Sequence, residues 1–388
     1  MSKVIKKLKI ILIIFATVIT IFGLIYQGNT GEKNVLNDLK QIFPTAVSFV
    51  KDNARYPVYE VFNADKNNLG YAVEASSAGY AGPIKVLAGI DNSGLIVDVI
   101  VLNQVETPWF FQKVLADGFL SRVKGHTVDD PLSLNSDIDA VSGATYTSEG
   151  IVNAVRKSSH WFGRSHLNLT IHEEPETLIG IEELLLGLLY VIVFFSLWKK
   201  YHKLRLLVMG ASLAFLGFWQ NSPISFANIA TLLTGNAPSY LERPFWYLLV
   251  VGTLFVTVLM GKNFYCYYLC PFGAIQEFLH KMGGMSYKPC PHTFKRLQKI
   301  RLGLTWLAFL LAIYLANPSI SSYEPFSALF KLQGNSAQWL LMPFVLFIGI
   351  FISRFWCKVF CPVGLVMDFC AKIRKRVIQL WGNLKTAK

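Results

Sequence analysis

Charged residues and cysteines are scarce in this chain. Asp, Glu, Lys and Arg make up 16% of its 388 residues, whereas 53% are hydrophobic and the mean hydropathy is +0.41. That composition is too apolar for an ordinary soluble domain of this length. The first of the six cysteines is Cys266, so residues 28–177 cannot hold a disulfide or a thiolate-bound metal. No histidine lies inside a long apolar run, which makes haem a poor candidate cofactor.

Long apolar runs recur along the chain, and each is close to the roughly 20 residues that a helix needs to cross a bilayer core. The first run follows a basic start, and no small-residue cleavage site comes after it, which favours an uncleaved anchor over a signal peptide. We expect a transmembrane anchor at 1–27, an extracytoplasmic domain at 28–177 and a five-helix membrane domain at 178–388. The six candidate spans are residues 10–26, 178–198, 204–219, 244–261, 301–316 and 338–355.

Lysine and arginine are unevenly shared among the segments between these runs. They gather before the first run, at 199–205, at 281–299 and after the last run, whereas 222–243 and 317–337 hold one each. By the positive-inside rule, both termini are cytoplasmic and residues 28–177 lie outside the cytoplasmic membrane. The net charge of +13 then reflects orientation and contact with the lipid bilayer. No motif for binding nucleic acid is apparent, and we expect no such partner.

The segment 28–177 has the pattern of an α+β domain. Residues 84–91 and 95–103 are strand-like and are joined by the turn sequence Asp91-Asn92-Ser93-Gly94. Helical signals precede them at 34–43 and follow them at 107–123. The fold class is therefore an α+β domain fused to an all-α membrane domain with six transmembrane helices in total.

A run of small and hydroxylated residues, "DAVSGATYTSEG" at 139–150, follows that domain's strands. One interpretation is a tight turn and a helix cap, because Gly favours turns and Ser and Thr favour helix starts. The other is a phosphate site. Gly143 and Ala144 would let the backbone approach the phosphate, amides opening the next helix would donate to it, and Ser142, Thr147 and Ser148 would add donors.

Residues 139–145 resemble the D-x-x-(S/T)-G-A-T signature of FMN-binding domains in membrane electron-transfer subunits, and Glu106-Thr107-Pro108 is similar to an upstream pattern of that family. The resemblance implies FMN attached through a phosphoester bond to Thr145, which we favour over Thr147. It also places Glu106 and Thr107 near the isoalloxazine or the sugar chain, although a polar strand end explains them nearly as well. The predicted flavin-site residues are Thr145, Ser142, Gly143, Ala144, Thr147, Ser148, Glu106 and Thr107.

The membrane half contains a duplicated motif. "NFYCYYLCPFGAIQEF" at 263–278 and "RFWCKVFCPVGLVMDF" at 354–369 share F-[YW]-C-x-x-x-C-P-x-G-x-x-x-[ED]-F. In a helix the two cysteines share a face, and Pro after the second suits the first position of a new helix. The second cysteine would then lie at a helix N-terminus, which favours a thiolate or an anionic cluster.

Two copies of CxxxCP supply four candidate metal ligands, Cys266, Cys270, Cys357 and Cys361. Four thiolates match an iron–sulfur cluster, which we favour, a structural zinc is a second interpretation, and four free reduced thiols are a third. Cys290 and Cys370 are expected to be ordinary thiols.

Together these features resemble the NosR/NirI type of membrane flavoprotein, and in length and layout the short RdhC/PceC proteins encoded beside reductive dehalogenases. A cytoplasmic ferredoxin-like domain does not follow "IRKRVIQLWGNLKTAK" in this sequence, which favours the short type. The resemblance implies an electron carrier, rather than a stand-alone catalyst, that passes electrons from the cytoplasmic side or the quinone pool to the outer FMN. A reductase or a maturing metalloenzyme outside the membrane would receive them, and a flavin transferase of the ApbE type would load the FMN. A redox sensor and an outer-facing flavin reductase of a small molecule are the alternatives.

Overall fold

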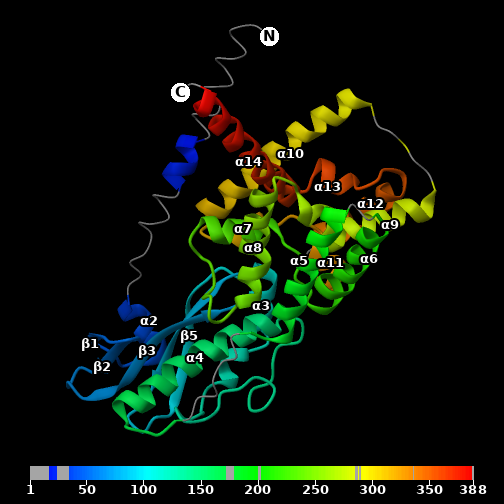
Figure 1. Ribbon diagram of the computed structural model, residues 1–388. Coiled ribbons are helices and arrows are strands. Elements are labelled where there is room, and N and C mark those ends of the chain that lie inside the picture. Colours follow the sequence, from blue (N-terminus) through cyan, green and yellow to red (C-terminus); the bar gives the residue numbers. More distant parts are fainter. Residues whose placement is uncertain are drawn as a thin grey trace. The chain divides into compact units, whose positions relative to one another are not determined.

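The computed structural model describes residues 17–23, 35–171, 179–199, 202–284, 287, 290–334 and 336–386. The chain divides into two compact units (Figure 1). The first, which we call the α+β unit, comprises residues 1–176, 230–242 and 310–320. The second, the helical unit, comprises residues 177–229, 243–309 and 321–388.

A five-stranded antiparallel sheet in the order β1-β2-β3-β4-β5 forms the centre of the α+β unit. The two strands expected from the sequence are β4 and β5, and they pair from Ile84 opposite Gln104 to Ile90 opposite Ile96. The three strands before them were not predicted from the sequence. Residues of β1 are mostly exposed and polar, so this edge strand carries no strong hydrophobic alternation. The strands are β1 Ser48–Asn53, β2 Pro57–Phe62, β3 Asn68–Ala78, β4 Pro83–Ile90 and β5 Ile96–Gln104.

Helices cover both faces of this sheet. Neighbouring residues of a strand point to opposite faces, and β3 shows the consequence. Ala72 packs in one core cluster with Leu39 of α2 (Val35–Ile42), whereas Val73 packs in another with Phe162 of α4 (Thr145–His166). Helix α3 (Pro108–Ala116) and the short helix η1 (Phe119–Arg122) follow β5 and add side chains to the core on the α4 side. Ile151 and Val152, in the first half of α4, are buried in the same core.

Helices overlap each of the five apolar runs predicted between residues 178 and 355, although their bounds differ from those of the runs. Within the described part of the chain, α5 (Ile181–Lys199) and α10 (Pro291–Tyr314) are long and apolar enough to cross a membrane, whereas α8 (Pro244–Met260) and α12 (Ser336–Phe351) are shorter apolar helices. The run at 204–219 forms α6 (His202–Ser212) and one stretch of π-helix, η2 (Leu213–Trp219). Most of the run at 10–26 lies outside the described residues. The part of it that is described, residues 17–23, is helical. Six spans therefore stay a prediction.

Two of the segments between the apolar runs contain short helices that were not predicted from the sequence. Residues 222–243 include α7 (Phe226–Leu233), and residues 317–337 include η4 (Pro318–Ser321) and α11 (Phe326–Phe330). Helices this short are unstable alone and depend on tertiary packing. Phe226 and Phe326 supply that packing, since both are buried in the core of the helical unit.

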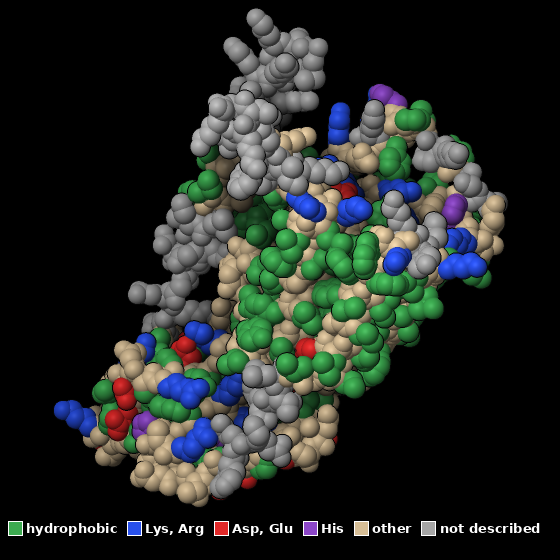
Figure 2. Space-filling model, viewed as in Figure 1, with side chains coloured by type: hydrophobic (Ala, Val, Ile, Leu, Met, Phe, Trp, Pro, Cys, Tyr) green, Lys and Arg blue, Asp and Glu red, His purple; other side chains and the backbone are tan. Residues whose placement is uncertain are grey.

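Apolar side chains also cover much of the helical unit's visible surface (Figure 2). On α5, for example, Val191, Phe194 and Trp198 are 65%, 60% and 72% exposed. A helix that is apolar on its outer face as well as its inner face is typical of a lipid environment. The surface therefore agrees with the membrane assignment made from the sequence.

Candidate functional site

The hydroxyl-rich segment forms a tight turn that leads into α4. The amide of Ala144 donates to the carbonyl of Val141 across 2.9 Å, and Gly143 between them has a φ of +77°. Glycine adopts this left-handed conformation without the steric cost that other residues meet. Helix α4 then begins at Thr145, and no side chain caps its first turn. Backbone amides at the start of a helix are the groups that bind phosphate.

The three neighbouring hydroxyls differ in their surroundings. The Thr145 side chain is exposed, and so is Ser142. Thr147 is buried, and its hydroxyl donates to a carboxylate oxygen of Glu106. Ser148 is also buried, and its Oγ accepts from the amide of Val141 across 3.2 Å. The hydroxyls of Thr147 and Ser148 are therefore engaged in hydrogen bonds within the α+β unit. Thr145, the first residue of the helix, is accessible.

Glu106 connects three segments of the α+β unit. Its carboxylate accepts from the amide of Ala81 across 2.8 Å and from Thr147, and its carbonyl accepts from Asn317 Nδ2 (3.1 Å) and Ser319 Oγ (3.0 Å). Burial raises the pKa of this carboxyl and outweighs the lowering effect of the hydrogen bonds from Thr147 and from backbone amides including that of Ala81. The sequence predicted Glu106 near the flavin. Its carboxylate contacts identify it as the residue that fixes the motif helix.

Aromatic residues near the motif went unnoticed in the sequence. The ring of Tyr80 stacks on that of Tyr146 with centroids 6.3 Å apart, and it meets Phe110 edge-on at 5.5 Å. Thr107 is half-buried at the N-cap of α3, where its carbonyl accepts from the Phe110 amide across 2.9 Å. The sequence gives only positions for these residues. Tyr80 follows β3, Thr107 and Phe110 follow β5, and Tyr146 lies inside the hydroxyl-rich motif.

In the helical unit, both CxxxC segments form a single helical turn. The first is η3 (Tyr265–Leu269) and the second is α13 (Phe355–Val359). The same hydrogen bond ends each turn: Cys270 N donates to Tyr265 O across 2.8 Å, and Cys361 N donates to Trp356 O across 3.0 Å. The repeat seen in the sequence is therefore a structural repeat as well.

Each second cysteine lies directly before a new helix, as the sequence predicted. Helix α9 (Pro271–Gly283) follows Cys270, and α14 (Pro362–Thr386) follows Cys361. The Gly273 amide donates to Cys270 Sγ across 3.4 Å, and the Gly364 amide donates to Cys361 Sγ across the same distance. Amide donors at a helix N-terminus stabilise negative charge on sulfur.

The four motif thiols influence one another electrostatically. Burial is the largest cause that raises the pKa of the Cys361 thiol, and charges on Cys357, Cys266 and Cys270 raise it further. In the described ranges, no three His, Cys, Asp or Glu side chains converge as the ligands of a single metal ion. Cys290 is exposed and Cys370 is half-buried. The structure thus gathers the four predicted ligands in one region without bringing three of them to one point.

The chemistry of this region fits an iron–sulfur cluster. All four candidate ligands are cysteines, and two of them already accept a backbone hydrogen bond on sulfur. Trp356, directly before Cys357, is buried, and its indole N–H has no hydrogen-bond partner in the described structure. A buried donor without an acceptor is costly, and cluster sulfurs are acceptors that such donors tune. When bound, a cluster here would supply one-electron transfer.

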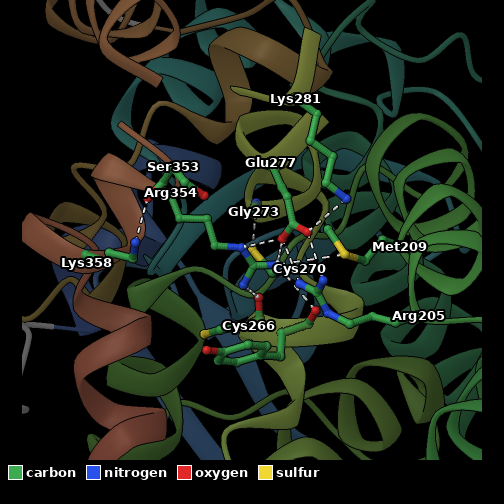
Figure 3. A network of polar contacts seen from close by, with 11 residues as sticks. Arg205, Met209, Cys266, Cys270, Gly273, Glu277, Lys281, Ser353, Arg354 and Lys358 are labelled. Atoms are coloured by element: carbon green, nitrogen blue, oxygen red, sulfur yellow. Dashed lines mark hydrogen bonds and ion pairs between the residues drawn. The ribbon is translucent and has the colours of Figure 1, made fainter. Parts of the chain in front are cut away.

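Charged residues that we did not predict surround the first motif (Figure 3). Glu277, on α9, pairs with Arg205 of α6 across 2.6 Å and with Arg354 across 2.8 Å. Glu277 and its counterpart Asp368 were visible in the sequence as the shared acidic position of the repeat. The partners of Glu277 could not be identified from the sequence, because Arg205 and Arg354 are far from it along the chain.

Two family models match the chain at these sites. Residues 79–159 match an FMN-binding domain, which includes Glu106 and the motif that opens α4. Residues 242–289 and 339–380 match a 4Fe-4S binding domain, and each stretch contains one CxxxCP motif. These matches support FMN and an iron–sulfur cluster as the cofactors.

Curated relatives match parts of the chain. The protein NirI of Paracoccus denitrificans is 28% identical over 199 residues, which are 46% of this chain and 28% of NirI. One component of the ion-translocating oxidoreductase complex of Aliivibrio fischeri is 31% identical over 132 residues, or 31% of this chain and 60% of that component. The regulatory protein NosR of Pseudomonas aeruginosa is 24% identical over 189 residues, or 44% of this chain and 26% of NosR. The matched stretches thus span less than two thirds of each relative.

Proposed function

Since the chain belongs to the NosR/NirI type of FMN-binding electron-transfer flavoproteins, we propose that it carries FMN covalently on Thr145 and exchanges electrons between that flavin and a cluster at the CxxxCP motifs. The observation that carries this proposal is the contrast between two hydroxyls on α4. Thr145 is exposed at the first residue of the helix, whereas Thr147 is buried and donates to Glu106. A flavin transferase could reach the former without unfolding the unit.

The residues of the α+β unit would hold and orient the flavin. Gly143 turns the chain so that amides of the first turn of α4 can donate to the phosphate, and the exposed Ser142 adds a hydroxyl. Glu106, with Thr147, fixes α4 against the loop that contains Ala81. Tyr80 and Tyr146 offer an aromatic surface for a planar ring. Covalent attachment would retain a cofactor that faces the outside of the cell.

The residues of the helical unit would hold the second cofactor. Cys266, Cys270, Cys357 and Cys361 would supply thiolate ligands, and the amides of Gly273 and Gly364 would donate to two of the ligand sulfurs. Cys270 and Cys361 are buried and Cys266 and Cys357 are half-buried, and access of water to a cluster is one of the factors that set its potential.

The surroundings of the protein follow from the same proposal. It would be a multi-pass protein of the cytoplasmic membrane with both termini inside and the α+β unit outside, which the Lys and Arg distribution and the apolar helices support. A flavin transferase of the ApbE type would load FMN, and the quinone pool or a cytoplasmic donor would supply electrons. The acceptor would be a reductase or a maturing metalloenzyme outside, a role consistent with a relative that by its name belongs to an oxidoreductase complex.

A redox sensor is the second candidate function, because NosR of Pseudomonas aeruginosa is named a regulatory protein. The two functions predict different flavin kinetics. A carrier reoxidises its flavin rapidly with a partner enzyme and turns over many times. A sensor changes redox state without sustained flux.

Flavin attachment is tested by substituting each hydroxyl in the full-length protein, co-produced with a flavin transferase. Thr145→Ala should abolish flavin fluorescence of the denatured protein in a gel, because no phosphoester can form. Thr147→Ala is the matched control and should keep the fluorescence in the protein that folds. Undiminished covalent flavin in Thr145→Ala would refute the proposal.

A further inference from the structure

The two CxxxCP repeats exchange side chains in a reciprocal way. Asn263, three residues before the first cysteine of its motif, donates through Nδ2 to Oδ1 of Asp368 in the other repeat across 2.9 Å. Arg354 occupies the same position in the second repeat, and its Nε donates to Oε2 of Glu277 in the first repeat across 2.9 Å. We call these two contacts the cross-repeat clasp.

The clasp is not electrically symmetric. Glu277 contacts two arginines, Arg205 and Arg354. Asp368 contacts only one arginine among the described residues, Arg301 at 3.6 Å, and the neutral amide of Asn263. The arginine at the clasp position therefore brings an additional positive charge to one side of the paired motifs.

Arg354 also contacts the backbone of the first motif. Its Nη1 donates to the carbonyl of Cys266 across 2.7 Å, and its Nη2 donates to that of Tyr267 across 3.3 Å (Figure 3). The guanidinium lies 5.1 Å from the centre of the Tyr267 ring. Its planar array of donors can make these bonds at once, which an ammonium group cannot.

The backbone of Arg354 is held in an unusual conformation for this purpose. Its φ and ψ are +55° and +43°, in the left-handed region that is sterically unfavourable for a residue with a Cβ. Residues kept in such a conformation cluster at functional sites. The side chain is buried and fully directed toward the first motif, so the strain accompanies a specific placement of charge.

The charge of Arg354 acts on both motifs. Its guanidinium donates to the carbonyls of Cys266 and Tyr267 in the first motif, and the residue itself lies three positions before Cys357 in the second. A positive charge this close to both motifs favours an added electron on a group that their cysteines would bind. Low polarity around the site strengthens this effect.

From this geometry we infer that Arg354 is a positioning and potential-setting residue of the cluster site: it joins the two repeats and stabilises the reduced form of the bound cluster. This inference rests on the proposed function, since it requires a cluster at the four cysteines. Glu277 acts in the opposite direction, because its negative charge lies against the same guanidinium.

The test is a redox titration of the purified full-length protein, followed by the spectroscopic signal of the cluster, with iron measured in parallel. Arg354→Gln should shift the reduction equilibrium at least tenfold toward the oxidised form, a fall of 59 mV for a one-electron couple. Glu277→Gln should shift it the other way. Arg354→Lys keeps the charge and should remain closer to the wild type than Arg354→Gln. Lys281→Gln is the control, because Lys281 is 3.6 Å from Glu277 but 48% exposed, and solvent screens its charge.

The possible outcomes separate this inference from the proposed function. A wild-type protein without iron and sulfide would refute the cluster and the inference with it. A wild-type cluster whose potential is unchanged in Arg354→Gln and Glu277→Gln would overturn the inference alone. Loss of iron in Arg354→Gln, in Glu277→Gln and also in Arg354→Lys would mean that the cross-repeat clasp is only structural. That result would overturn the inference as well.

Discussion

The hydroxyl of Thr147 donates to the carboxylate of Glu106, and both side chains are buried in the α+β unit. The bond joins the motif helix to the segment that follows β5 and leaves Thr145, two residues earlier, exposed at the surface. One threonine of the motif thus has a structural partner and the other is accessible, which supports the proposed attachment at Thr145.

Removing the Thr147 hydroxyl should destabilise the α+β unit. In Thr147→Val the shape is kept, but a buried carboxylate loses a donor, which costs about 1–3 kcal/mol. Thermal unfolding of the full-length protein in detergent, produced without a flavin transferase and followed by circular dichroism, would measure the loss, because all variants are then compared without covalent flavin. Thr145→Val is the matched control, because that side chain is exposed and should change the unfolding temperature little.

Glu106 should make the stability of this unit depend on pH. Burial raises the pKa of its carboxyl in the folded protein above the ordinary value of 4.5. The folded state then binds the proton more tightly than the unfolded state, so this contribution is complete below 4.5 and is lost as pH rises through the raised pKa. Glu106→Gln should reduce the fall in unfolding temperature as pH rises above 4.5. An equal fall in both proteins would contradict the assignment.

The four motif cysteines should act as one set. Alanine at Cys266, Cys270, Cys357 or Cys361 should each remove the same iron and acid-labile sulfide, because a cluster tolerates loss of a thiolate ligand poorly. Cys290→Ala and Cys370→Ala should retain both. Zinc in place of iron in the wild type, or normal iron in any of the four variants, would favour one of the other interpretations of the motif.

The glycines of the two motifs should tolerate alanine unequally. A Cβ at Gly364 would lie 3.1 Å from the carbonyl oxygen of Cys357, whereas a Cβ at Gly273 would lie 3.4 Å from that of Cys266. The first distance requires the backbone to move and the second is an ordinary contact. Gly364→Ala should therefore lose more iron than Gly273→Ala, as measured by metal analysis. Equal losses would mean that the two motifs do not differ in packing.

Much of the architecture could be predicted because its signals are local. The apolar run from Val86 to Ile90 predicts a buried strand, and the turn residues before Leu95 predict its hairpin. Proline after Cys270 and after Cys361 predicts where α9 and α14 begin. The strand β1 and the helices α7 and α11 were not predicted, because they are short and depend on packing rather than on their own periodicity.

The sequence by itself determined which chemistry is available: a Gly143-Ala144-Thr145 turn before a helix, and four cysteines in two CxxxCP motifs. Those features depend on residues that are neighbours along the chain. Only the tertiary structure decided which threonine is buried against Glu106 and which arginine of the second repeat contacts Glu277 of the first. Thr147 meets Glu106 from 41 residues away, and Arg354 meets Glu277 from 77 residues away. Side-chain contacts at such separations are set by how helices and strands pack, and no local pattern encodes them.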